Sequence, residues 1–301
     1  MSDIKLFRMD KNSVTEIKGT SVALEKSLQV LIEEHLEEFL GVRFLASEFT
    51  TGPKHGGRID TLGIDENGCP VIIEYKRAIN ENVINQGLFY LDWLLDHTGE
   101  FTLLVMNKLG KDVADSIAWN IPRLLCIAGD FTKYDEHAVQ QIGRNIELIR
   151  YRHYGDLLLL DLVNAARTES VQESAQPSGG KQKTWDKTVS EQLEQADQGT
   201  KDRFESIKAY LLALGDDVQM NTLKLYVAFK KIKNFVCVQV QPKVITLYLR
   251  LDPASVEIED GFTRDVSKIG HWGTGDLEVV IRSDDDFEKA QPLLAKAYEL
   301  S

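Results

Sequence analysis

The stretch that most constrains the fold reads GGRIDTLGIDENGCPVIIEYKR and covers residues 56–77. Two strand-like runs, Arg58–Asp65 and Pro70–Arg77, flank a turn sequence in which Gly68 can supply the left-handed backbone that three-residue loops need. The apolar run at residues 71–73 is typical of a buried central strand. The stretch therefore predicts a β-hairpin whose second arm lies inside a sheet.

Charged side chains interrupt this hairpin where apolar ones should pack. If Asp65 and Cys69 close the loop, Asp60 lies directly opposite Glu74, and Lys76 lies two residues further along on the same face. Charges on a buried strand are costly unless they are paired or bind a metal. The hairpin thus gathers two carboxylates and an ammonium group on one small patch.

Two carboxylates this close repel each other, and the pKa of one should rise. A hard divalent cation between them removes that cost. Mg²⁺ commonly takes one or two protein carboxylates, with water and phosphate in its other positions. The pattern therefore predicts a Mg²⁺ or Mn²⁺ site at Asp60 and Glu74, where Lys76 can hold or deprotonate an attacking water or neutralise a phosphate.

The chain has 301 residues, and one stretch that is poor in apolar residues and rich in Ser, Gln and Gly divides it. We expect a first domain over residues 1–165, a flexible linker over residues 166–200 and a second domain over residues 201–301.

Apolar periodicity and turn signals predict the order αβββαβαβ for the first domain, which implies a mixed sheet covered by helices. The predicted helices are 22–40, 82–96 and 112–120, and the predicted strands are 44–50, 58–65, 70–77, 101–107, 123–129, 146–152 and 157–163.

The second domain is predicted to be α+β. We expect a helix over 204–214, strands over 223–229, 235–240, 244–251 and 277–282, and a final helix. Ser283, with Asp286 three residues later, predicts an N-terminal capping box for that helix, and Pro292 is expected to kink it.

The hairpin resembles the PD-(D/E)XK nuclease superfamily. RID, then thirteen residues between the two acids, then EYK matches the pattern of that superfamily, although Ile59 stands where its usual proline would be. QGLFY places Gln86 and Tyr90 at i and i+4 on the next helix, which is similar to the QxxxY element of RecB-like and NucS-like members. ALEKSLQVLIEEHLEEFLG resembles the first helix of the NucS catalytic domain, and Glu25 is the matching acid.

The resemblance covers roughly residues 22–109 and implies a restriction-endonuclease-like α/β domain with mixed sheet and flanking helices. It implies an endonuclease that hydrolyses phosphodiester bonds of DNA with Mg²⁺ or Mn²⁺ and leaves a 5′-phosphate. Asp60, Glu74 and, through a water, Glu25 would bind the metal. Lys76 would position the nucleophilic water, while Gln86 and Tyr90 would hold Lys76 and the phosphate. Many members cut as dimers, which leaves a homodimer open.

The second domain resembles an uncharacterised bacterial domain that is sometimes labelled a predicted transport protein, through the stretches LYVAFKKIKNF and RDVSKIGHWGTGDLEV. Its partner is open between nucleic acid and protein. Val218–Arg250 carries six basic residues and no acidic one. These lysines either occupy exposed strand faces or form a nucleic-acid surface with Tyr226 and Phe229.

Composition excludes several classes of protein. The net charge of −12 argues against nonspecific coating of nucleic acid by the whole molecule. No run approaches the roughly 20 apolar residues that span a bilayer, and the N-terminus lacks the features of a secretory signal, so we expect no membrane partner. The three cysteines are far apart and form no CxxC pair, which favours a cytoplasmic protein without a zinc ribbon or disulfide framework.

Other interpretations stay open at this stage. Glu25 is equally well explained as an acid in the first turn of a helix. Arg58 and Arg77 either contact phosphate or balance the acidic patch, and His55 lies in a flexible Gly-rich loop to which we assign no catalytic role. The alternative function is a catalytically silent module on a nuclease fold that recruits nucleic acid or a protein without cutting. An adaptor for a transport or defence complex, acting through residues 201–301, ranks third.

Overall fold

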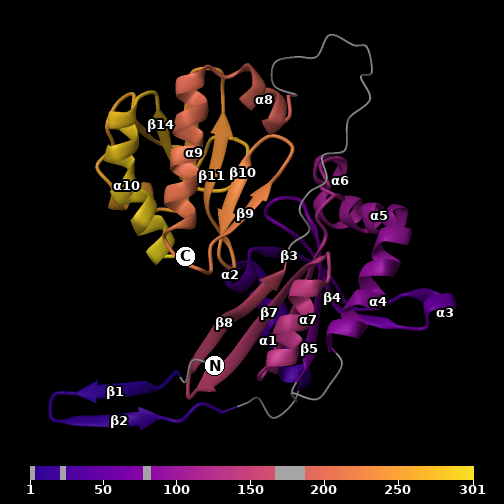
Figure 1. Ribbon diagram of the computed structural model, residues 1–301. Helices are drawn as coiled ribbons and strands as arrows, with labels where there is room; N and C mark the ends of the chain where they lie inside the picture. Colours follow the sequence, from indigo (N-terminus) through magenta and orange to yellow (C-terminus); the bar gives the residue numbers. More distant parts are fainter. Residues whose placement is uncertain (1–3, 21–24, 77–82, 167–186) are drawn as a thin grey trace. The chain divides into compact units, whose positions relative to one another are not determined.

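The computed structural model describes residues 4–20, 25–76, 83–166 and 187–301. The chain divides into two compact units, residues 1–170 and 171–301. The first holds a mixed six-stranded sheet with helices, and the second holds an antiparallel six-stranded sheet with helices (Figure 1). This confirms the predicted fold class. Among the described residues, none of the helices combines the length and the apolar composition that crossing a membrane requires.

The sheet of the first unit has the order β3-β4-β5-β6-β7-β8. Neighbours β5 and β6 run parallel, as do β6 and β7, and the remaining pairs run antiparallel. The strands are β3 (Val42–Thr50), β4 (Arg58–Asp65), β5 (Pro70–Lys76), β6 (Arg123–Ala128), β7 (Asn145–Tyr154) and β8 (Leu157–Ala166). The helices of the unit are α1 (Glu25–Glu34), α2 (Leu36–Leu40), α3 (Gly52–His55), α4 (Val83–Asp96), α5 (Thr98–Leu109), α6 (Lys111–Asp115) and α7 (Lys133–Gln141).

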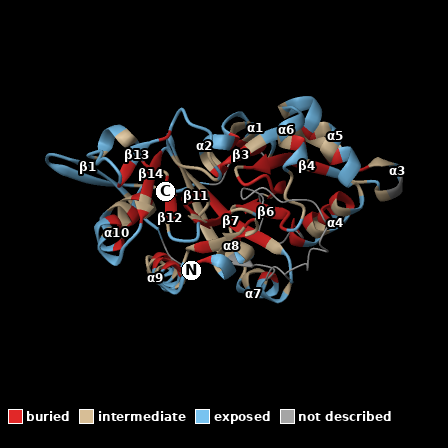
Figure 2. Ribbon diagram, turned by 90° about the horizontal axis from the view of Figure 1, so that it is seen from above, coloured by how far each residue is buried: buried red, intermediate tan, exposed pale blue. Residues whose placement is uncertain are grey.

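The predicted hairpin is confirmed in both turn and register. The Asp65 N–H donates to the carbonyl of Cys69 over 2.9 Å, and Gly68 has a φ of 77°, as the loop requires. Thr61 pairs with Ile73 at the open end of the β4–β5 ladder, so the next residues along are Asp60 and Glu74. The arm β5 lies between β4 and β6, and its residues are almost all buried. All residues of the neighbouring β6 are buried as well, and the centre of this sheet is coloured red in Figure 2.

Helices on the two sides of β5 build the walls of the site. Helix α1 contacts β4 and β5, and α4 contacts β5 and β6. The α4 side belongs to a continuous apolar core that includes Leu62, Ile72, Leu91 and Trp93. Burial of this core fixes the strands, so the side chains at the ends of β4 and β5 are held in place by the rest of the domain.

A buried ion pair ties three strands together below the site. Arg123 of β6 binds Asp65 of β4 over 2.7 Å and Glu147 of β7 over 2.8 Å, and all three residues are buried. Each charge is compensated, which is the condition under which charges are tolerated in a core.

Several predicted elements of the first unit are wrong. Residues 101–107, expected as a strand, lie in helix α5, because Phe101 and Val105 are buried four residues apart while Leu103 and Met106 face outward. The helix expected over 22–40 breaks at His35 into α1 and α2, and the one expected over 112–120 shortens to α6. Helix α7 and the hairpin of β1 (Leu6–Asp10) and β2 (Ser13–Ile17) were not predicted.

The second unit has the strand order β13-β14-β12-β11-β10-β9, and every neighbouring pair is antiparallel. Its strands are β9 (Gln219–Thr222), β10 (Val227–Lys230), β11 (Asn234–Val240), β12 (Ile245–Leu249), β13 (Thr263–Asp265) and β14 (Leu277–Ile281). Its helices are α8 (Val189–Gln195), α9 (Gln198–Leu212) and α10 (Asp284–Glu299). The capping box of Ser283 and Asp286 at α10 is confirmed, and Pro292 lies inside that helix.

The linker expected over residues 166–200 is shorter than predicted. Residue 166 ends β8, α8 covers residues 189–195, and α9 begins at residue 198. Thr188 caps α8 through a box with Glu191, and Val189 is buried in the core of the second unit. The polar composition of this stretch was interpreted as a linker, although its polar residues cap these helices and cover their outer faces. Residues 167–186 lie outside the described residues.

Candidate active site

A cleft of about 800 Å³ opens at the ends of β4 and β5. The loop that contains α3, the start of β4, the end of β5 and helices α1 and α4 line it. Five of the six predicted site residues line this cleft: Glu25, Asp60, Lys76, Gln86 and Tyr90. The sixth, Glu74, is fully buried beside Asp60.

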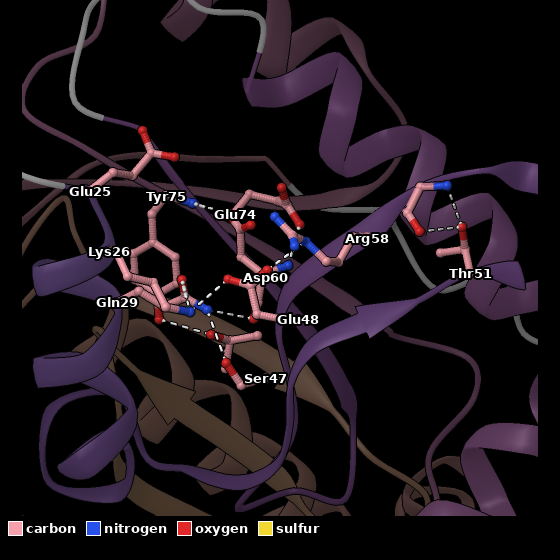
Figure 3. Close-up of polar contacts among 12 residues, drawn as sticks. Glu25, Lys26, Gln29, Ser47, Glu48, Thr51, Arg58, Asp60, Glu74 and Tyr75 are labelled. Carbon is pink, nitrogen blue, oxygen red and sulfur yellow. Dashed lines mark hydrogen bonds and ion pairs between the residues drawn. The ribbon is translucent and has the colours of Figure 1, made fainter.

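Asp60 and Glu74 lie next to each other, as the register predicted (Figure 3). The backbone N–H of Asp60 donates to Oε1 of Glu74 over 3.2 Å, and the N–H of Tyr75 donates to Oδ2 of Asp60 over 3.1 Å. Each carboxyl is therefore fixed by the backbone of the strand that carries the other. The two carboxyls also interact directly through their side chains.

The pKa values of both carboxyls are raised, and that of Glu74 lies above neutral pH. Burial, strengthened by the charge of Asp60, raises the pKa of Glu74 to about 9. Burial also raises the pKa of Asp60, against the opposing effects of the Tyr75 N–H and Lys76. An acid whose pKa lies above neutral pH carries a proton unless a cation replaces it.

The donors present suit a hard divalent cation. They are carboxylate oxygens from two adjacent strands of one sheet, and the Asp60 carboxylate lines a cleft with room for water and a phosphate. Oxygen ligands of this kind, few in number, are what Mg²⁺ and Mn²⁺ accept in substrate-binding sites.

Glu25 lies apart from this pair in Figure 3. Its Oε1 approaches Nζ of Lys76 at 3.3 Å. Among the described residues there is no group of three or more His, Cys, Asp or Glu side chains that could hold a metal ion. The structure thus brings together two of the three predicted metal ligands and places the third against the predicted catalytic lysine.

Gln86 and Tyr90 extend from α4 toward the two strands. Nε2 of Gln86 donates to Oε2 of Glu74 over 2.8 Å, and the N–H of Arg58 donates to the Tyr90 hydroxyl over 3.1 Å. The prediction had them hold Lys76 and a phosphate, whereas the structure shows them holding Glu74 and the β4 backbone. Gly57 makes this approach possible, because a Cβ there would lie 2.5 Å from Cε1 of Tyr90.

Two residues of the site were not predicted. Gln29 of α1 is buried and donates to the carbonyl of Asp60 over 2.8 Å, which fixes β4 against the helix. Glu48 of β3 forms ion pairs with Lys26 and with Arg58, and Arg58 lines the cleft. The position of Gln29, four residues after Glu25, was a usable signal, since both lie on one helix face. Nothing in the sequence marked Glu48.

Arg58, His55 and Arg77, the other residues considered near the hairpin, differ in their positions. Arg58 lines the cleft. The ring of His55, at the end of α3, lies 5.5 Å from the rings of Phe89 on α4 and of His97, which follows α4, so His55 belongs to an aromatic cluster. Arg77 lies outside the described residues.

The basic stretch of the second unit gives little support to a stacking surface. Phe229 is buried in the apolar core and cannot stack on a base, which corrects that part of the interpretation. Lys231 pairs with Asp217 at 3.7 Å and lies 4.6 Å from the centre of the Tyr298 ring. In the loop GHWGTGD, Gly275 has a φ of 133° and packs directly on the backbone of Leu249, as in a tight turn.

Comparisons with known proteins give a relative without an assigned activity. Residues 189–301 match a family described as a domain of unknown function, DUF5655. An uncharacterized protein of Haemophilus influenzae is 29% identical over 304 residues, which cover 98% of this chain and 99% of that protein.

Two solved structures show weaker similarity. The first is a repair endonuclease from Pyrococcus abyssi, with 19% identity, 46% of this chain and 50% of that chain covered, and a TM-score of 0.29. The second is a complex of EndoMS with double-stranded DNA, with 17% identity, 49% and 64% covered, and a TM-score of 0.25. The chain therefore spans about half the length of the first of these. TM-scores this low carry no conclusion about activity, which has to come from the geometry of the site.

Proposed function

We propose that this protein is a metal-dependent endonuclease that hydrolyses phosphodiester bonds of DNA in the cleft at β4 and β5. The observation that carries the proposal is the Asp60–Glu74 pair, in which two acids meet across one hairpin with Lys76 on the same strand. A bound Mg²⁺ or Mn²⁺ would supply Lewis acidity and neutralise charge on the phosphate.

Asp60 and Glu74 would hold that cation. Their raised pKa values mean that the folded chain keeps two acids in an unfavourable place. Arrangements of this kind concentrate at functional sites, because an uncompensated acid pair costs stability and is tolerated only where a ligand uses it. Gln86 fixes the side chain of Glu74 and so fixes the direction of one carboxylate oxygen.

Lys76 would bind and orient the attacking water and accept or return its proton. It ends β5 two residues after Glu74, so its side chain follows the same face into the cleft. Glu25 pairs with Lys76 from α1 and thereby limits where the ammonium group can go. In this arrangement Glu25 is a positioning residue, and Lys76 is the group that touches the reacting water.

Tyr90 would keep the start of β4 in place. Its hydroxyl accepts the N–H of Arg58, two residues before Asp60. The wall that faces the phosphate is thus built by hydrogen bonds between α4 and β4.

Purified full-length protein should nick or cut DNA in the presence of Mg²⁺ or Mn²⁺ and not in EDTA. Plasmid, single-stranded and branched DNA are compared as substrates. Asp60→Asn, Glu74→Gln and Lys76→Ala should each lower the rate by at least about a hundredfold. Asp92→Asn, on the exposed side of α4, is the matched control and should cut like the wild type.

Equal activity in the three site variants and the wild type would overturn the assignment. Binding of DNA or RNA without cleavage, unaffected by metal, would instead favour the silent binding module. Melting curves of every variant exclude unfolding as the cause of a lost activity.

A further inference from the structure

Glu48 has the most unusual backbone in the part of the chain that the structure describes. Its φ of 53° makes it the one residue other than glycine with a positive φ there. On either side of it, Ser47 pairs with Thr61 and Phe49 pairs with Ile59, so Glu48 faces the Asp60 position of β4. A left-handed glutamate on a strand is strained, and such residues concentrate at functional sites.

The strained backbone brings the Glu48 carboxylate between two cations. Oε1 lies 2.6 Å from Nζ of Lys26, and Oε2 lies 2.5 Å from Nε of Arg58. Oε2 is buried and accepts no hydrogen bond from the described residues, and the nearest cation to it is Arg58. Lys26 lowers the pKa of Glu48 most strongly, and Arg58 adds to this effect. A pair that merely lay on the surface would not need a backbone conformation that L residues rarely adopt.

Arg58 has unused binding capacity. Its side chain is 66% exposed, it lines the cleft, and no described residue accepts a hydrogen bond from its two terminal amino groups. Arg58 also lies two residues before Asp60 on β4, so both side chains follow one face of the strand. A guanidinium fork of this kind matches the oxygens of a phosphate.

We propose that Arg58 binds a phosphate of the nucleic-acid backbone beside the Asp60–Glu74 pair, and that Glu48 is a counterion built into β3 that occupies Arg58 until this phosphate replaces it. The inference rests on the proposed function, since it takes DNA as the ligand of the cleft. Lys26 makes the exchange feasible, because it stays paired with Glu48 after Arg58 has moved to the phosphate. Glu48 thus lowers the affinity of the empty cleft for DNA and keeps Arg58 in position.

The test is DNA binding without cleavage. Affinity for a short fluorescein-labelled oligonucleotide is measured by fluorescence anisotropy in EDTA, over a range of salt concentrations. Arg58→Ala should weaken binding about tenfold and reduce the salt dependence by about one phosphate contact. Glu48→Gln should tighten binding about three- to tenfold, because it removes the competing charge and frees Arg58. The double variant should bind like Arg58→Ala.

The double variant separates this account from a general charge effect. If Glu48 acts through Arg58, the gain from Glu48→Gln disappears when Arg58 is absent. A gain that persists in the Arg58→Ala background, an unchanged or weaker affinity of Glu48→Gln, or an unchanged affinity of Arg58→Ala each overturns the inference. Arg152→Ala is the matched control, since Arg152 is a partly exposed arginine paired with an acid, Asp130, outside the cleft.

The outcomes also separate the two proposals. If the protein cuts DNA with Mg²⁺ but its affinity for DNA in EDTA is the same with and without Arg58, this inference alone is overturned. A protein that binds DNA through Arg58 and never cuts overturns the proposed nuclease activity alone.

Discussion

Replacement of Glu74 by glutamine should make the metal-free protein more stable and inactive at the same time. Burial and the charge of Asp60 raise the pKa of Glu74 from an ordinary 4.5 to about 9. Between these values the folded chain holds a proton that the unfolded chain has released, so the wild type loses stability as the pH rises through this window. Glutamine has the same shape, titrates nowhere and removes this loss.

The size of the effect follows from the same values. At pH 7, keeping the proton on Glu74 costs about 1.4 kcal/mol for each pH unit above 4.5, or about 3 kcal/mol in total. This free energy is an upper bound, because part of the electrostatic cost falls on Asp60 and because the protein interior rearranges around the charge. For a unit of this size it corresponds to a rise in melting temperature of about 5–10 °C. Local hydrogen bonding survives the change, because the amide of Gln86 can turn to accept from the new amide while the Asp60 N–H still donates to the new carbonyl.

The assay is thermal or urea unfolding of wild type and Glu74→Gln in EDTA, at several pH values between 4.5 and 9. The difference between them should grow with pH across this range. Added Mg²⁺ or Mn²⁺ should stabilise the wild type, by favouring the ionised acid, and leave the variant unchanged. A variant that is less stable than the wild type in EDTA, or a difference that does not depend on pH, would refute the reasoning. Asp92→Asn, an exposed acid-to-amide change on α4, should leave the pH profile unaltered.

Three further changes test other parts of the structure. Arg123→Met should lower the free energy of unfolding in urea by about 3–5 kcal/mol, because it leaves two buried carboxylates without this cation. A decrease below about 1 kcal/mol would contradict the importance of the ion pair. Gly57→Ala should push the Tyr90 ring away from β4, since the new Cβ would lie 2.5 Å from Cε1 of Tyr90. DNA cleavage should fall while the melting temperature falls only slightly. Wild-type activity would count against the role of this contact. Val105→Glu should unfold the first unit whereas Leu103→Glu, at a position 56% exposed, should be tolerated; equal effects would contradict helix α5.

The sequence was sufficient for the hairpin and for the pairing of its two acids. The turn has one favourable solution, and that solution fixes which residues face each other, so a local rule determines a contact between residues far apart in the chain. Gln86 and Tyr90 were found through the resemblance of QGLFY to the QxxxY element, and helical spacing adds only that both lie on one face.

The partners of these residues could not be found in this way. Glu25 binding to Lys76, and Gln86 binding to Glu74, depend on how α1 and α4 are placed on the sheet, which tertiary packing decides. Glu48 reaches Arg58 through a local distortion of β3 that no pattern of apolar residues signals. The regular alternation of side chains along an undistorted strand would have directed the Glu48 side chain elsewhere.

The misassigned strand over 101–107 has a similar origin. A short apolar run is compatible with a buried strand or with a helix, and its length does not decide between them. Packing of Phe101 and Val105 into the core selected the helix.

Anomalous scattering from a crystal soaked in Mn²⁺ tests the central claim most directly. We expect a manganese peak bonded to a carboxylate oxygen of Asp60 and to one of Glu74, which disappears in the Glu74→Gln crystal. A soaked crystal that shows both side chains in the positions described above and no manganese at them, or manganese bound only elsewhere, would contradict a divalent cation site in this hairpin.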